Sequence, residues 1–175
     1  MYFKELQVPA DVKVEFSGNI VKASGPKGAL EKKLELIKDI KIEVAENKVK
    51  VSSENERRKV KALIGTTVAH IKNAVEGVSK GFTYRLRVVY SHFPITVKIE
   101  GNRFLIQNFI GERVPRVAKI IGKTQVKLEG SDVIVTGIDL DEVSHTASRI
   151  EQACRIVGYD KKKFMDGIYI VSKGE

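Results

Sequence analysis

The residues Gln152 to Lys173, QACRIVGYDKKKFMDGIYIVSK, decide how this chain is organised near its C-terminus. The stretch reads as the end of an amphipathic helix, a turn at Gly158 and a run of three lysines. Asp166-Gly167 then leads directly into the β-prone run Ile168 to Val171. Three adjacent ammonium groups repel one another, so a bound polyanion would relieve the repulsion and release its own counterions. The sequence leaves open the alternative that Lys161, Lys162 and Lys163 only solubilise a loop.

Upstream of this stretch, one order of predicted elements occurs twice. Alternation of apolar and polar residues predicts strands, and an apolar face at helical spacing predicts helices. In the first copy we expect strands Val12–Phe16, Ile20–Ala23 and Leu30–Leu36, a hairpin Lys41–Ser52 turning at Glu46-Asn47, a helix Glu54–Glu76, and a returning strand Phe82–Val89. In the second copy we expect a strand Ile95–Ile99, a hairpin Val126–Val135, a helix Leu140–Val157 capped by Asp139 or Asp141, and a final strand Ile168–Val171.

A nearly constant offset relates the two copies. Residues 12, 18 and 28 correspond to residues 95, 101 and 111 at a shift of 83, and the hairpins correspond at a shift of 84. Such a register indicates duplication of one unit. We therefore predict an α+β fold of two tandem repeats, 1–90 and 91–175, each an antiparallel β-sheet with one long α-helix packed on one face. The final strand would play the part of Leu86 to Val89.

The composition of the chain narrows the classes of protein to which it can belong. The chain has 175 residues, 42% of them hydrophobic, and carries a net charge of +9, which favours a nucleic-acid partner over an acidic small substrate. No run reaches the roughly 18 to 20 apolar residues of a membrane span, and the N-terminus has no apolar core after a basic start. We expect a cytoplasmic protein without a membrane partner. The single cysteine, Cys154, has apolar neighbours at helical spacing and is expected in the core.

The C-terminal stretch also resembles a known signature. The residues that match its spacings are Gln152, Ile156, Phe164, Asp166, Gly167, Ile168, Tyr169, Ile170 and Lys173. With these residues the stretch resembles the signature of the universal large-subunit ribosomal protein six family (bacterial count), in its archaeal and eukaryotic branch. Two positions depart from that signature: Tyr159 stands where a basic residue is usual, and Lys162 stands where Arg is usual and lacks the planar fork of Arg.

The resemblance, which spans both repeats, implies a structural component of the large ribosomal subunit. It implies binding to large-subunit rRNA mainly through the second repeat, near the sarcin-ricin loop and the region where translational GTPases dock. Neighbouring ribosomal proteins would be further partners. We expect no cofactor, no metal and no small-molecule substrate.

The candidate RNA-binding residues fall into two groups. Lysines and arginines would neutralise phosphates while the sheet keeps them in register with folded RNA. Phe164 is expected to pack beneath the lysine run, and Gly167 to permit a special backbone shape or a close approach of RNA. The first group is Lys161, Lys162, Lys163, Arg155, Arg149 and Lys173 with Phe164 and Gly167, and the second is Lys27, Arg113, Arg116 and Lys123.

Other readings of these residues stay open. The loop Gly25-Pro26-Lys27-Gly28 resembles a loop of the same family and could offer backbone amides to an anion, or it could be a plain turn. The basic residues between Lys98 and Lys127 fit a solvated face as well as an RNA-binding face. His145 lies near two serines, but nothing like GxSxG is present, and we expect no enzyme. The rival to RNA binding is a protein-interaction module whose basic surface is incidental.

Overall fold

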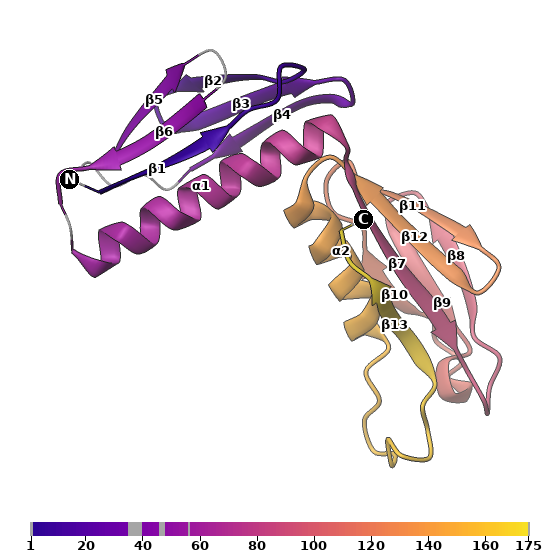
Figure 1. Ribbon diagram of the computed structural model, residues 1–175. Helices are drawn as coiled ribbons and strands as arrows, with labels where there is room; N and C mark the ends of the chain where they lie inside the picture. The colour runs from indigo at the N-terminus through magenta and orange to yellow at the C-terminus, as the bar shows by residue number, and fades with distance from the viewer. Residues whose placement is uncertain (1, 35–39, 46–47, 56, 175) are drawn as a thin grey trace. The chain divides into compact units, whose positions relative to one another are not determined.

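The computed structural model describes residues 2–34, 40–45, 48–55 and 57–174 and divides into two compact units, Met1–Gly81 and Phe82–Glu175. Within the first unit the described strands form two antiparallel sheets, drawn as indigo to purple arrows in Figure 1. One sheet has the order β1-β6-β5, with β1 (Tyr2–Gln7), β6 (Lys48–Ser53) and β5 (Lys41–Ala45). The other has the order β2-β3-β4, with β2 (Lys13–Ser17), β3 (Ile20–Gly25) and β4 (Gly28–Lys33).

The helix α1 (Arg58–Ser79) covers both sheets of the first unit (Figure 1). Its buried residues include Val60, Ile64, Ile71 and Val75, which recur at helical spacing and face β1, β3, β4 and β6. The helix begins later than predicted. The backbone amide of Arg57 donates to Oδ1 of Asn55 at 3.1 Å, a local turn that competes with helical backbone bonding before Arg58.

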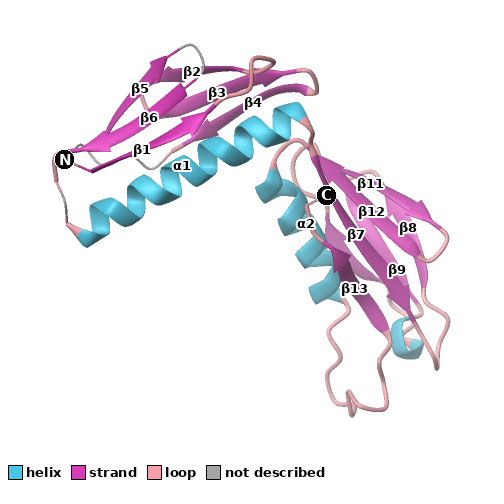
Figure 2. Cartoon of the chain, viewed as in Figure 1, coloured by secondary structure: helices cyan, strands magenta, loops and turns pink. Residues whose placement is uncertain are grey.

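The second unit repeats this arrangement (Figure 2). A sheet of order β10-β9-β8 contains β10 (Arg116–Lys119), β9 (Arg103–Gln107) and β8 (Thr96–Glu100), and a short 3₁₀ helix η1 (Phe109–Gly111) follows β9. A sheet of order β11-β12-β7-β13 contains β11 (Gln125–Glu129), β12 (Asp132–Gly137), β7 (Phe82–Val89) and β13 (Gly167–Ser172). The helix α2 (Leu140–Ala153) packs against β7, β10, β12 and β13. Fully buried side chains, among them Leu86, Phe104, Ile150 and Ile168, fill the core.

The predicted α+β class and tandem repeat are confirmed, with one refinement. Each unit divides its strands between two sheets, whereas the sequence predicted one sheet for each repeat. The strands β1, β9 and β10 were not predicted as strands. The turn at Glu46-Asn47 and the end of the predicted strand Leu30–Leu36 lie outside the described residues. Gly18 and Gly101, which are 83 residues apart, both turn their hairpins with positive φ, 62° and 57°.

The strand β7 belongs to the second unit, which corrects the predicted boundary at residue 90. It lies between β12 and β13, with Leu86 opposite Val133 and Ile170, and Arg87 donates to Asp132 across the β12 pair at 2.9 Å. In the first unit, β1 pairs with β6 as β7 pairs with β12. The strand β7 is therefore the first strand of the second repeat, and β13 is an addition on its other side rather than its counterpart.

Candidate nucleic-acid interface

The three lysines lie in the long loop between α2 and β13, which Figure 2 shows in pink. Asp160 holds this turn, because its Oδ1 accepts from the amide of Lys162 at 3.0 Å. Its carbonyl accepts from the amides of Lys163 at 3.0 Å and Phe164 at 2.9 Å. All three lysine side chains are exposed. The backbone is thus fixed by its own hydrogen bonds while the charges remain in solvent.

Phe164 anchors the turn to the unit beneath it. Its ring is half-buried and packs against the hydrophobic core. It stacks on His92 at 4.4 Å between ring centroids and lies tilted against Tyr159 at 4.9 Å. The prediction that Phe164 packs beneath the lysine run agrees with these contacts. His92 is therefore one of the residues that position the turn.

Asp166 ties the end of the loop to the segment after β7. Its carboxylate is fully buried and accepts from the amide and the hydroxyl of Ser91, at 3.1 and 3.0 Å, and from the amide of His92 at 3.3 Å. Burial acts to raise the pKa of Asp166, but these hydrogen bonds to the charged form outweigh it, and the pKa lies below its ordinary value. Asp166 is therefore a structural anchor that does not face a bound phosphate.

The structure gives a packing reason for a glycine at position 167. Gly167 is a buried residue of β13 and is absent from the positive-φ glycines, so a left-handed backbone does not explain it. A Cβ built there would lie 3.2 Å from the ring of Tyr169. The absence of a side chain at Gly167 lets this ring lie flat over the strand.

The structure brings together only part of the first group of basic residues. Arg155 and Lys161 line the same pocket as Phe164, at the start and the middle of the loop. Arg149 is exposed on α2, one helical turn and a half before Arg155. Lys173 follows β13, and the six residues of that strand place it about 20 Å from the loop end. Lys173 thus lies apart from the lysine turn.

Arg116, which was predicted as an RNA contact, makes its described hydrogen bonds within its own unit. Its guanidinium donates to both oxygens of Glu112, at 2.8 and 2.6 Å, and to the carbonyls of Ala153 and Arg155 at 2.9 Å each. It also lies over the ring of Phe109, 4.3 Å from the centroid. These bonds satisfy carbonyls at the end of α2, which stops at Ala153, four residues before the predicted end at Val157.

The other second-group residues are exposed without forming one site. Arg113 is exposed beside Val114, whose exposed fraction is 77%. Lys123 is exposed, but its backbone amide donates to Oε2 of Glu142 at 3.0 Å. The carboxylate of Glu142 therefore already accepts from a backbone amide of this loop, and its negative charge weakens the attraction of the loop for a phosphate.

The Gly25-Pro26-Lys27-Gly28 turn packs on the end of α1. The amide of Lys27 donates to the carbonyl of Val78 at 3.0 Å, and Nζ of Lys27 donates to the carbonyl of Lys80. A Cβ at Gly25 would lie 2.8 Å from the same Val78 oxygen. The amide of Lys27 is therefore not open to an anion, and the turn caps a helix, as the plain-turn alternative allowed.

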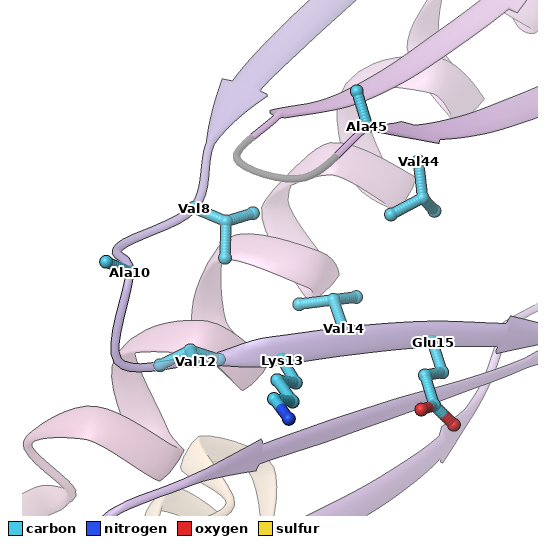
Figure 3. A pocket seen from close by; sticks show the side chains of 8 residues that line it. All are labelled: Val8, Ala10, Val12, Lys13, Val14, Glu15, Val44 and Ala45. Atoms are coloured by element: carbon cyan, nitrogen blue, oxygen red, sulfur yellow. The ribbon is translucent and has the colours of Figure 1, made fainter.

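Two pockets differ in chemistry. Figure 3 shows a pocket of about 390 Å³ in the first unit, where Val8, Val14 and Val44 meet Lys13 and Glu15. It has no aromatic lining, and its two charges are opposite. The pocket of the second unit, of about 290 Å³, has Phe164 and Tyr169 in its walls and two cations, Arg155 and Lys161. Only the second combines aromatic surface with positive charge.

Other chemistry is not indicated by the described residues. Among them no group of three or more His, Cys, Asp or Glu side chains could hold a metal ion. In the same residues, no helix is long and apolar enough to cross a membrane. Cys154 is buried as predicted, and burial raises the pKa of its thiol to about 11, which leaves it protonated and unreactive at neutral pH.

The sequence reasoning did not place Ser91 in this region and gave Tyr169 no role beyond its place in the signature. No local sequence pattern indicated the role of Ser91, because its hydrogen-bond partner, Asp166, is 75 residues away in the chain. The Gly-x-Tyr spacing of Gly167 and Tyr169 was a usable signal, since alternate strand residues share a face and a ring can lie over a glycine.

Comparison with known proteins assigns the family. The sequence model of the family described as Ribosomal protein L6 matches the chain twice, over residues 8–81 and 93–167, once within each structural unit. The chain is 48% identical over 172 residues to the large ribosomal subunit protein uL6 of Ignicoccus hospitalis, covering 96% of this chain and 92% of the relative. It is 44% identical to the proteins of the same name from Aeropyrum pernix, with 97% and 93% covered, and Methanosarcina mazei, with 97% and 96% covered. These findings confirm the expected resemblance, and the chain belongs to the Ribosomal protein L6 family.

Proposed function

We propose that this chain is a structural protein of the large ribosomal subunit and binds large-subunit rRNA mainly through its second unit. The observation that supports this most directly is the lysine turn, Lys161 to Lys163, which is exposed and whose backbone is held by Asp160. A turn whose backbone is already fixed loses little backbone freedom when its lysines meet a phosphate contour. The relatives are named as proteins of the large ribosomal subunit.

The mechanism we propose is electrostatic binding with recognition of RNA shape. Lysines neutralise phosphates and release counterions, while the anchored loop keeps the charges at fixed spacing. Double-stranded RNA displays phosphates and 2′-hydroxyls more accessibly than base edges, so a cationic turn suits its backbone. Arg155, which lines a pocket with Lys161, adds a planar guanidinium with five N–H donors beside the turn.

The position on the subunit is part of the proposal. The resemblance of the C-terminal signature supports a site near the sarcin-ricin loop, close to where translational GTPases dock, in a cytoplasmic ribosome. Neighbouring ribosomal proteins would contact the remaining surface, including the first unit. We propose no catalytic activity, because the family is one of ribosomal proteins.

A second function is favoured by exposed apolar side chains. Val114, Val157 and Met165 are exposed by 60% or more, which suits docking of a partner protein. Ionic strength separates the two functions. RNA binding through phosphates weakens steeply with salt, whereas apolar docking is nearly independent of it.

Crosslinking of the full chain to protein-free large-subunit rRNA tests the proposal. We expect the attached peptides to include residues 155–164 of the second unit, and binding to weaken steeply between 50 and 200 mM salt. Attachment confined to the first unit, or affinity that does not change with salt, would contradict binding through the lysine turn.

A further inference from the structure

The pocket beside the lysine turn has a composition that the electrostatic mechanism does not use. Its volume is about 290 Å³, just below the range of about 300 to 1,000 Å³ that small-molecule pockets occupy. Cys154 and Ile156 supply apolar surface, and Phe164 and Tyr169 supply aromatic surface. Arg155 and Lys161 place two positive charges among the same lining residues, against the one carboxylate of Glu151, whose Oε1 already accepts from the amide of Ile170. A single planar ring system with an attached anion fits this size and chemistry.

Hydrogen bonds join lining residues of the pocket to residues around it. Arg116 donates to the carbonyls of Ala153 and Arg155 at 2.9 Å each, which fixes the backbone at the end of α2. Oε1 of Glu151 accepts from the amide of Ile170 at 3.1 Å, which joins the helix to β13. The pocket therefore exists without a ligand and requires little reorganisation to bind one.

The ring of Tyr169 is fixed in the same way. Its hydroxyl donates to the carbonyl of Met165 at 3.2 Å, and the ring lies against the bare backbone of Gly167. The exposed fraction of Tyr169 is 43%, so much of the ring still faces solvent. An exposed aromatic ring of fixed orientation is a stacking surface for a base.

We propose that this pocket receives one unstacked base of the rRNA, stacked on Tyr169, with an adjacent phosphate held by Arg155 and Lys161. The inference rests on the proposed rRNA binding and specifies a nucleotide for it. Unpaired bases in loops and bulges expose their faces, and proteins bind them on aromatic side chains. The valine-lined pocket of the first unit lacks such a ring and is not assigned this ligand.

Two substitutions of one residue separate stacking from charge. Tyr169→Leu removes the ring, whereas Tyr169→Phe keeps it and removes only the hydroxyl. Neither changes net charge, and both are at a part-exposed site where the fold tolerates change. Tyr169→Val, whose β-branched side chain suits a strand, serves as a second ring-deleted variant. Circular dichroism and thermal unfolding check each fold.

The probe is full-length, protein-free large-subunit rRNA, with affinity measured over a salt series and base reactivity mapped by chemical probing. We expect Tyr169→Leu and Tyr169→Val to bind about 5- to 100-fold more weakly at every salt concentration. The slope of affinity against salt should stay unchanged, because no phosphate contact is lost. One base protected by the wild type should become reactive again, whereas Tyr169→Phe, which keeps the stacking ring, should keep the protection and bind more tightly than either ring-deleted variant.

Other outcomes overturn the inference in distinguishable ways. If the ring-deleted variants keep the wild-type affinity and protection while the wild type shows a steep salt slope, rRNA binding stands but the base assignment fails. The pocket would then belong to another occupant, such as an apolar side chain of a neighbouring protein. If the wild type itself does not bind the rRNA, the proposed function fails and the base assignment fails with it.

Discussion

Asp166 is a charged residue at a position with no exposed surface, and its partners explain why it stays charged. Replacing it with Asn keeps Oδ1 but sets an NH₂ group against the amides of His92 and Phe93, which now donate to Oδ2 at 3.3 and 3.4 Å. We expect Asp166→Asn to lower the free energy of unfolding by about 1–3 kcal/mol at pH 7. Urea denaturation measures this difference. Asp160→Asn, an exposed carboxylate of the same loop, should change it by less than about 0.5 kcal/mol.

The effect of Asp166→Asn should depend on pH. Because hydrogen bonds hold the folded-state pKa below the unfolded-state value, the stabilisation is complete above the unfolded pKa and is lost as pH falls through the folded pKa. The difference in stability between wild type and variant should therefore be constant near neutrality and shrink below about pH 4. A difference that grows on acidification would contradict the assignment of a charged Asp166.

Arg116 gives a second prediction at the scale of single residues. Lys cannot reach both oxygens of Glu112 and two carbonyls at once, so Arg116→Lys should cost about 1–3 kcal/mol of unfolding free energy. Chemical denaturation measures the loss. Arg113 is an exposed residue nearby, so the control variant Arg113→Lys should leave the free energy of unfolding almost unchanged. Equal stabilities of the two variants would show that the contacts of Arg116 are dispensable. The salt slope of rRNA binding should be unchanged by Arg116→Lys.

These residues show where sequence reasoning stops. The lysine run, Phe164 and the core position of Cys154 could be predicted, since each depends on neighbours close in the chain. The bonds from Arg116 to the end of α2 span 37 and 39 residues, and no local pattern encodes them. A basic residue in a strand looks the same in sequence whether it meets phosphate or a carbonyl.

At the scale of elements, α1 allows two glycines to be compared. Gly25 lies against the end of α1, and a Cβ there would meet the carbonyl oxygen of Val78 at 2.8 Å. Gly65 lies inside α1, where a Cβ would meet only Nζ of Lys4 at 3.7 Å. We expect Gly25→Ala to destabilise the protein by about 1–3 kcal/mol, because backbone must shift. Gly65→Ala should stabilise it by about 0.5–1 kcal/mol, as Ala does in helix interiors.

Thermal unfolding measured on both glycine variants decides the outcome. The two melting temperatures should move in opposite directions from the wild type. A stabilising Gly25→Ala would mean that the turn before β4 does not pack on α1 as described.

Most elements were predictable because their periodicity is local. The strand β1 was missed since it is an edge strand whose residues are mostly exposed, so its sequence lacks alternation. The strand β7 was predicted, but its partners were not. Alternation of apolar and polar residues shows that a strand has one buried face. Which sheet β7 joins depends on its pairing with distant residues such as Val133 and Ile170.

At the scale of the whole molecule, the position of β7 predicts how the chain can be divided. A fragment of residues 82–175 retains β7 between β12 and β13 and should unfold cooperatively. A fragment of residues 91–175 lacks this inner strand and exposes two unpaired edges, so it should not fold. Circular dichroism and amide hydrogen exchange distinguish the two. A folded 91–175 fragment would contradict the described sheet order.

The account depends on the lysine turn binding rRNA phosphates, and the salt dependence of binding tests this most directly. The variant changes Lys161, Lys162 and Lys163 to Ala in the full chain. The control changes Lys13, Lys48 and Lys59 of the first unit, three exposed lysines, so that both proteins lose the same net charge. Affinity for protein-free large-subunit rRNA is measured from 50 to 200 mM salt.

The account predicts that the slope of log affinity against log salt becomes shallower by about 2 to 3 for the turn variant, at about 0.7–0.9 per lost phosphate contact. The control should change the slope by less than 1. An unchanged slope for the turn variant, or the same change in both variants, would contradict the account.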